Sequence, residues 1–215
     1  MWKIVRTLLS LLIVTAVYFL CEKATWGFTP ACLYTQHDIG FENEGLEPTP
    51  YLQQKYYLTA QGGQSYVFFS EDGQYVLKFF KDMPRPWLTK ESYQTKKWGK
   101  LHRTLTGYKL AYDHLHEETG LITLHLKPDT TPLITRLIDR LGIEHTVDLG
   151  STYFVIQKRA EPLTFDQFQS HIQAIRVILK KQQAKQIVDH DTRLLSNIGW
   201  VGKPVFIDPG RFTHE

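Results

Sequence analysis

The stretch YYLTAQGGQSYVFFSEDGQYVLKFFK, residues 56–81, contains two apolar runs separated by a strong turn signal. Both runs are rich in aromatic and β-branched residues, and Asp72-Gly73 lies between them. This pattern is typical of two antiparallel strands joined by a tight turn. We therefore predict strands at residues 66–69 and 75–80, and a fold that contains an antiparallel sheet.

A lysine, Lys78, interrupts the second apolar run, YVLKFF. Successive side chains of a strand point to opposite faces, so Lys78 shares a face with Val76 and Phe80. If that face is buried, the ammonium group needs an anion as its partner. If Leu77 and Phe79 form the inward pair instead, Lys78 faces solvent. The sequence leaves both arrangements open.

A second stretch, VDHDTRLLSNIGWVGKPVFIDPGRF at residues 188–212, gathers acidic and amide side chains around two short apolar runs. The two runs predict another hairpin, with Asn197 just before its first strand and Asp208 just after its second. A purely structural alternative is a solvated turn, capped by aspartate and asparagine side chains, between a helix and the hairpin.

The two stretches, in this order along the chain, resemble a protein-kinase domain. Residues 60–67 read AQGGQSYV where the family has G-x-G-x-x-G-x-V, and YVLK at residues 75–78 stands in place of V-A-I-K. Small residues, Ala60 and Ser65, replace the outer glycines of the family pattern. The resemblance implies a nucleotide-binding set: Gly62, Gly63, Ser65, Val67, Val76 and Lys78.

The second stretch resembles the catalytic loop and the metal-binding DFG segment of the same family. The resemblance implies Asp191 and Lys78 as catalytic residues, Asn197 and Asp208 as metal ligands, and ATP and Mg²⁺ as cofactors. Asp191 precedes Asn197 by six positions, one more than in the family, and Asp189 precedes it by eight. Pro209 replaces the phenylalanine of DFG. These departures leave open which aspartate is the general base, and they do not affect the two expected metal ligands.

Between the two stretches, residues 86–120 form a long, polar, helix-compatible segment that ends on a glycine. It occupies the place of the family helix whose glutamate pairs with the strand lysine. Because no acid lies between Glu91 and Asp113, we expect Asp113 to be the partner of Lys78, with Glu117 and Glu91 as the alternatives. The histidines that follow, His114 and His116, point to different faces of a helix, which favours a solvated helix end over a metal site.

The resemblance implies an α+β, protein-kinase-like fold with a five-stranded antiparallel N-lobe, one long helix and a truncated helical C-lobe. The C-lobe is expected to begin with a helix capped by Thr164. The expected organisation has four segments: a membrane anchor or signal segment at 1–21, a linker or lid at 22–55, the N-lobe at 56–163 and the reduced C-lobe at 164–215.

The N-terminal segment carries Lys3 and Arg6 before an uncharged apolar run at residues 7–21. Counted from Ile4, the run approaches the length of about 20 residues that a spanning helix needs. We expect a single-pass anchor through residues 4–21. A cleaved signal peptide, which would leave a secreted protein, is the alternative.

Composition bounds the function further. The formal net charge of +3 gives no reason to expect nucleic-acid binding, and two cysteines, Cys21 and Cys32, cannot form a disulfide framework. Three functional hypotheses remain: a membrane-anchored ATP–Mg²⁺-binding protein acting as an atypical phosphotransferase, an inactive pseudokinase-type module that binds a protein partner at a membrane, and an envelope protein whose acidic loop only caps a sheet.

Overall fold

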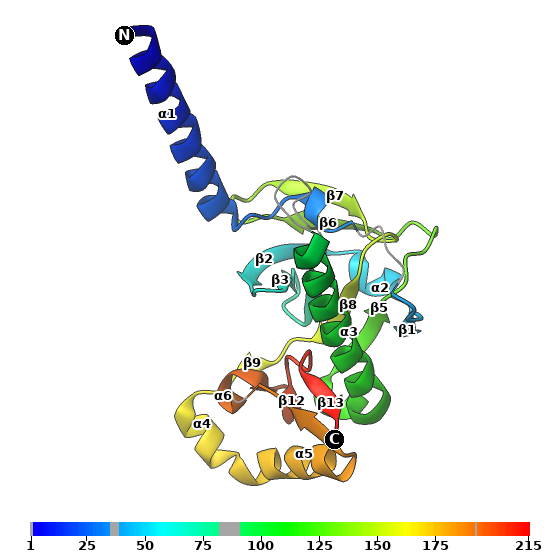
Figure 1. Cartoon of the computed structure of the whole chain (residues 1–215). Helices are drawn as coiled ribbons and strands as arrows, with labels where there is room; N and C mark the ends of the chain where they lie inside the picture. Colours follow the sequence, from blue (N-terminus) through cyan, green and yellow to red (C-terminus); the bar gives the residue numbers. More distant parts are fainter. Residues whose placement is uncertain (1, 35–38, 82–90, 192) are drawn as a thin grey trace.

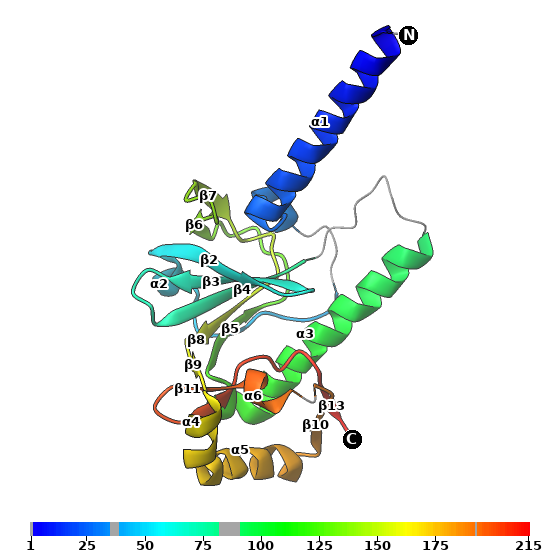
Figure 2. The same cartoon turned by 90° about the vertical axis from the view of Figure 1, so that its left-hand side faces the viewer.

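The computed structural model describes residues 2–34, 39–81, 91–191 and 193–215. A long N-terminal helix projects from one end of the molecule, a curled sheet forms the middle, and the C-terminal helices lie at the opposite end (Figures 1 and 2).

The sheet has eight strands within the described residues, in the order β1-β5-β8-β4-β3-β2-β6-β7. It is therefore larger than the expected five-stranded sheet. The five central neighbours, from β5 to β2, are antiparallel throughout, whereas β6 joins β2 in parallel. The strands are β1 (Glu44–Gly45), β2 (Lys55–Gln61), β3 (Ser65–Ser70), β4 (Tyr75–Phe80), β5 (Leu121–His125), β6 (Ile134–Ile138), β7 (Glu144–Asp148) and β8 (Phe154–Lys158).

The hairpin of β3 and β4 is the one that residues 56–81 predict. Gly73 adopts a φ of +71°, a left-handed conformation that a glycine accepts at little cost. Between β4 and β5, the long helix α3 (Glu91–Thr119) crosses the sheet, with one non-helical residue at Leu115. It ends at Gly120, whose φ is +64°. The predicted stop is confirmed.

The sheet buries both faces. Toward α3 and the C-terminal elements, Phe80, Leu105 and Tyr108 belong to one buried cluster. On the other face, Leu77 and Phe79 belong to a second cluster. Alternate residues of β4 therefore face different cores, and Lys78 points to the side of α3.

The C-terminal part begins after β8. Thr164 caps α4 and accepts a hydrogen bond from the Gln167 amide in a capping box, as the sequence predicts. The helix is interrupted at His171, so two helices stand where one was expected. The elements are β9 (Glu161–Pro162), α4 (Phe165–Ser170), α5 (Ile172–Ala184), β10 (Ile187–Asp189), α6 (Leu194–Asn197), β11 (Ile198–Trp200), β12 (Pro204–Phe206) and β13 (Phe212–His214).

The N-terminal helix α1 (Trp2–Thr25) has no buried residue and is long and apolar enough to cross a membrane. A signal sequence would pass the same test. The segment that follows includes η1 (Pro30–Cys32) and α2 (Thr49–Leu52). Part of this expected linker or lid is packed in the core, because Phe28, Leu33 and Leu52 are each at most 3% exposed.

Candidate nucleotide and metal site

Lys78 is buried on β4, with 8% of its surface exposed. Its Nζ donates one hydrogen bond to the Tyr108 hydroxyl over 3.2 Å and another to the backbone carbonyl of Ile207. Burial lowers the pKa of Lys78, and the nearby charge of Asp208 opposes this effect. Of the two arrangements that the sequence left open, the inward one is therefore observed.

Tyr108 of α3 connects Lys78 to the turn after β12. Its hydroxyl donates to Oδ1 of Asp208 over 3.1 Å. Burial, followed by the charge and the hydrogen bond of Asp208, raises the pKa of Tyr108 well above its usual value. The tyrosine therefore stays protonated and acts at once as acceptor for the ammonium and donor for the carboxylate.

Two glycines allow the Asp208-Pro209-Gly210 turn to approach α3 this closely. A Cβ on Gly107 of α3 would lie 2.5 Å from the carbonyl oxygen of Pro209. A Cβ on Gly210 would lie 2.9 Å from Cγ2 of Thr104, one helical turn earlier. Real Cβ atoms do not approach neighbours this closely, so larger residues here would push the turn away from the helix.

Asn197 is brought to the same region by the pairing of β11 with β12. Its backbone carbonyl accepts a hydrogen bond from the amide of Ile207 over 2.8 Å, which places it beside the residue before Asp208. The Asn197 side chain is 5% exposed, and its Nδ2 lies 3.5 Å from Oδ2 of Asp189.

The two candidate bases have different environments. Asp191 is bound by Arg193 through the backbone amide and the guanidinium, at 2.8–3.1 Å. These hydrogen bonds hold the pKa of Asp191 well below its usual range. Burial, assisted by the charges of Asp191 and Asp208, raises the pKa of Asp189 against the hydrogen bonds that it accepts. The pKa values of the two aspartates are thus shifted in opposite directions, a difference that the sequence does not predict.

Asp113 does not contact Lys78. Its carboxylate binds Lys109, one helical turn earlier, at 2.7 Å, and Lys109 also pairs with Glu44 of β1. The expected Lys78–Asp113 pairing is wrong because the face of α3 that meets β4 carries Tyr108, which binds Lys78 through a hydroxyl rather than a carboxylate. The glycine before it, Gly107, was an available signal, since a glycine inside a helix often marks a close approach.

The turn between β2 and β3 holds the glycines that the resemblance assigns to the nucleotide. The amide of Gly62 donates to the carbonyl of Ser65 over 2.8 Å. Gln64 accepts a hydrogen bond from the Thr104 hydroxyl of α3, next to Gly210. Among the described residues, no atom lies within 4 Å of a Cβ built on Gly63, so packing within these residues does not require a glycine there.

Two other members of the expected nucleotide-binding set lie beside Lys78. Val67 is its cross-strand neighbour on β3, and Val76 lies two residues before it on β4. Both are at least half-buried. The strands therefore group these three residues, while Ser65 and the glycines lie at the β2–β3 turn.

Asp208 and Asn197 offer a carboxylate and an amide oxygen, which are ligands that suit a hard divalent cation such as Mg²⁺. The Asp208 carboxylate is exposed, with Oδ1 held by Tyr108. The described residues contain no group of three or more histidine, cysteine, aspartate or glutamate side chains placed to hold a metal. A cation here would therefore need Asn197 and oxygens of a bound phosphate in addition to carboxylate.

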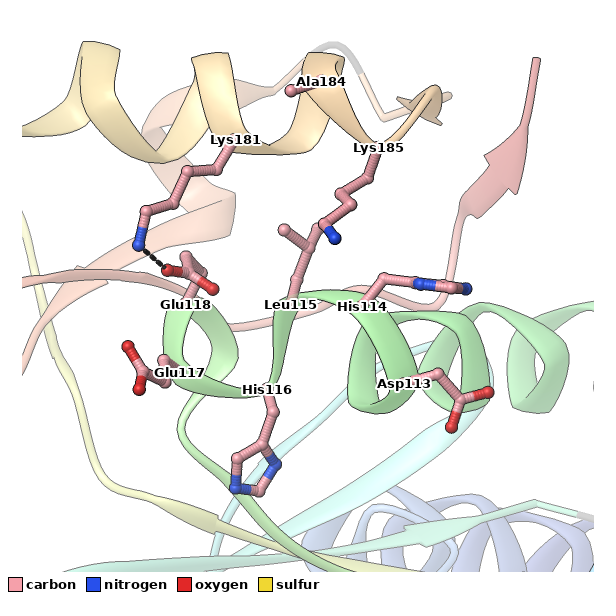
Figure 3. A pocket seen from close by; sticks show the side chains of 9 residues that line it. All are labelled: Asp113, His114, Leu115, His116, Glu117, Glu118, Lys181, Ala184 and Lys185. Atoms are coloured by element: carbon pink, nitrogen blue, oxygen red, sulfur yellow. Dashed lines mark hydrogen bonds and ion pairs between the residues drawn. The ribbon is translucent and has the colours of Figure 1, made fainter.

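The acidic and histidine-rich end of α3 lies elsewhere, over α5. Its residues line an open hollow of about 410 Å³ (Figure 3). Glu118 pairs with Lys181 of α5, while the rings of His114 and His116 point in different directions. His114 and His116 are therefore separated, as expected of a helix end, and the His114 ring instead lies 5.4 Å from the ring of His214 on β13.

No known protein family and no curated protein matches the sequence. The structure is similar to solved structures of WbdD, one of them described as a bifunctional kinase-methyltransferase. A 2.2 Å crystal structure of WbdD has 14% identity and a TM-score of 0.41, covering 73% of this chain and 32% of that chain. A complex of WbdD with the kinase inhibitor LY294002 has 14% identity and a TM-score of 0.37, covering 71% and 32%.

The chain thus spans about a third of the length of the WbdD structures that it matches. Both TM-scores are below 0.5, so no statement about fold family or activity rests on this likeness.

Proposed function

We propose that this chain is a membrane-anchored, kinase-like protein that binds ATP with Mg²⁺ and acts as an atypical phosphotransferase. The observation that carries the proposal is the hydrogen-bonded chain from buried Lys78 through buried Tyr108 to exposed Asp208, which joins a strand, a helix and an acidic turn distant in sequence. An ammonium pairs with phosphate oxygens and a carboxylate binds a divalent cation, so the two ends of this chain offer partners for both parts of a phosphate–metal ligand.

In this proposal Asp208 and Asn197 would hold the cation, and Lys78 would bind a phosphate oxygen in place of the Ile207 carbonyl. The β2–β3 turn, with Gly62 and Gly63, would cover the phosphates. The nucleotide with its metal supplies the transferable phosphoryl group. The residues of this chain bind it, orient it and exclude water.

Asp191 is the proposed general base, by its position in the motif. A base must accept a proton from the substrate, and efficiency depends on a pKa matched to the working pH. Asp189 is the second candidate, because its pKa is raised and it contacts Asn197. Substituting each aspartate by asparagine separates the two, since only the base is needed for turnover while the nucleotide remains bound.

The competing function is an inactive module that recruits a protein partner at a membrane. One observation favours it: the groups expected to bind phosphate already have internal partners. Lys78 is bonded to Ile207 and Tyr108, and Gln64 of the β2–β3 turn is bonded to Thr104.

The deciding experiment is the denaturation of the full chain in detergent, with and without ATP and Mg²⁺. A ligand that binds only the folded state stabilises it by about 2.7 kcal/mol at a hundred times its dissociation constant. Asp208→Asn should remove most of this gain. Asp113→Asn, which alters a carboxylate bonded to Lys109, should keep it.

Each outcome has one meaning. An ATP-dependent gain together with turnover that Asp191→Asn abolishes supports the phosphotransferase, and loss of turnover only in Asp189→Asn moves the base to Asp189. A gain without turnover supports the inactive module. The absence of any gain, with or without Mg²⁺, overturns the nucleotide site.

A further inference from the structure

The turn between β6 and β7 is a tightly built structure that presents apolar side chains to solvent. The Asp139 carboxylate accepts hydrogen bonds from the amides of Leu141, over 2.8 Å, and Ile143, over 3.0 Å. Gly142 has a φ of +82° and donates its amide to the Asp139 carbonyl over 3.0 Å. Within this turn Leu141 is 56% exposed and Ile143 is 52% exposed.

This turn lies beside the C-terminal end of α1. Arg140 and Leu141 line an open hollow of about 460 Å³ together with Leu20, Lys23 and Ala24 of the helix. Nη1 of Arg140 donates to the backbone carbonyl of Lys23 over 3.0 Å. Leu141 therefore lies at the level of the last turns of α1.

The exit of α1 is fixed to the sheet, so this relationship does not depend on a loose linker. The Arg140 guanidinium lies 4.5 Å from the ring centroid of Trp26. The next residues are held as well, because Tyr66 donates to the Gly27 carbonyl over 2.9 Å and Phe28 is 2% exposed. Figures 1 and 2 both show α1 meeting the body at β6 and β7, far from α4 and α5.

We propose that the β6–β7 turn is a second membrane contact. Leu141 and Ile143 enter the boundary between headgroups and acyl chains, and Arg140 and Lys23 face anionic headgroup phosphates. Trp26 lies at the same level, as aromatic residues commonly do at membrane interfaces. The partner is the phospholipid leaflet at the C-terminal end of α1.

This inference rests on the membrane-spanning part of the proposed function and is independent of nucleotide binding. It also has a consequence for the site. With α1 and the β6–β7 turn both in contact with the bilayer, the sheet is tied to the membrane at two points. The C-terminal elements, including the Asp208 turn, lie on the side away from the lipid.

The test uses the full chain in nanodiscs of phosphatidylcholine and phosphatidylglycerol. In a Cys21→Ser, Cys32→Ser background, single cysteines are introduced by Leu11→Cys, Leu141→Cys or Leu195→Cys and labelled with a nitroxide. Power-saturation electron paramagnetic resonance compares the accessibility of each label to oxygen, which concentrates in lipid, and to a water-soluble nickel chelate. Leu195, on α6 and 43% exposed, is the matched aqueous control.

We expect the oxygen-to-nickel ratio at position 141 to exceed that at position 195 several-fold and to lie below that at position 11. A lipid value at position 11 with an aqueous value at position 141 overturns the second contact and leaves the anchor intact. An aqueous value at position 11 overturns the anchor and this inference together. Neither result bears on the ATP-dependent stabilisation.

Discussion

Tyr108 of α3 donates a hydrogen bond to Asp208 over 3.1 Å, although the two residues are a hundred positions apart. The same hydroxyl accepts a hydrogen bond from Lys78 of β4. One side chain thus couples the sheet, the helix and the acidic turn. Any displacement of α3 relative to the sheet would alter the surroundings of Lys78 and Asp208 together.

Tyr108→Phe should destabilise the protein by about 1–3 kcal/mol, because a buried ammonium loses a partner and the hydrogen bonds lost involve charged groups. Urea denaturation measures the change. Tyr57→Phe is the control, since Tyr57 is 42% exposed on β2, and it should alter stability by no more than about 0.5 kcal/mol. Equal effects in both variants would contradict a linking role for Tyr108.

Gly107→Ala and Gly99→Ala lie in the same helix and should have opposite effects. At Gly107 the new Cβ would lie 2.5 Å from the Pro209 carbonyl, so the variant should lose stability and displace the Asp208 turn. At Gly99 no described atom lies within 4 Å, so alanine should stabilise by about 0.5–1 kcal/mol. Thermal denaturation measures both changes, and stabilisation by Gly107→Ala would mean that the turn does not pack on α3.

Lys78→Met should leave the protein equally stable at neutral pH, or more stable by about 1–4 kcal/mol, because an apolar side chain replaces a buried charge. The folded-state pKa of Lys78 is below its usual value of 10.5, owing to burial. Between these two pKa values the unfolded chain binds more protons, so the stability of the wild type rises with pH.

The free energy of unfolding of wild type minus that of Lys78→Met should therefore increase as the pH is raised toward 10.5. Burial raises the pKa of Tyr56 above its usual value of 10.0, so both proteins lose stability above pH 10 as this tyrosine ionises in the unfolded chain. Subtracting one free energy of unfolding from the other removes this shared contribution. Denaturation at several pH values checks the slope. A difference that falls with pH would mean that Lys78 is stabilised as a cation.

Deletion of residues 1–21 should release the protein from membranes and leave its fold unchanged, because no residue of α1 is buried. Membrane fractionation shows the first effect, and a cooperative melt of the truncated protein shows the second. Mass spectrometry of the full chain serves as the control for signal cleavage. An intact full-length protein in the soluble fraction would contradict the anchor.

Local signals were sufficient for much of the secondary structure. Asp72-Gly73 predicted the β3–β4 turn, Gly120 the end of α3 and Thr164 the cap of α4, because each residue's own backbone or side-chain chemistry specifies the conformation. The hairpin of β11 and β12 was also predictable. It places Asn197 beside Ile207 through a backbone hydrogen bond.

Other features depend on which distant segments meet. The parallel pairing of β2 with β6 extends the sheet beyond five strands, and neither sequence carries a local sign of it. The partner of Lys78 was mistaken for Asp113 for the same reason. Tyr108 and Asp113 lie on different faces of α3, and only the packing of the helix on the sheet determines which face meets Lys78.

The sequence by itself therefore determined the β3–β4 and β11–β12 hairpins, the end of α3 at Gly120, the cap of α4 at Thr164, and that the N-terminal segment is apolar enough to span a bilayer. Only the tertiary structure decided that Tyr108 lies between Lys78 and Asp208, and that Asp189 and Asp191 have pKa values shifted in opposite directions. The physical reason is that partner choice and desolvation depend on which distant segments pack together, and short stretches of sequence do not encode this.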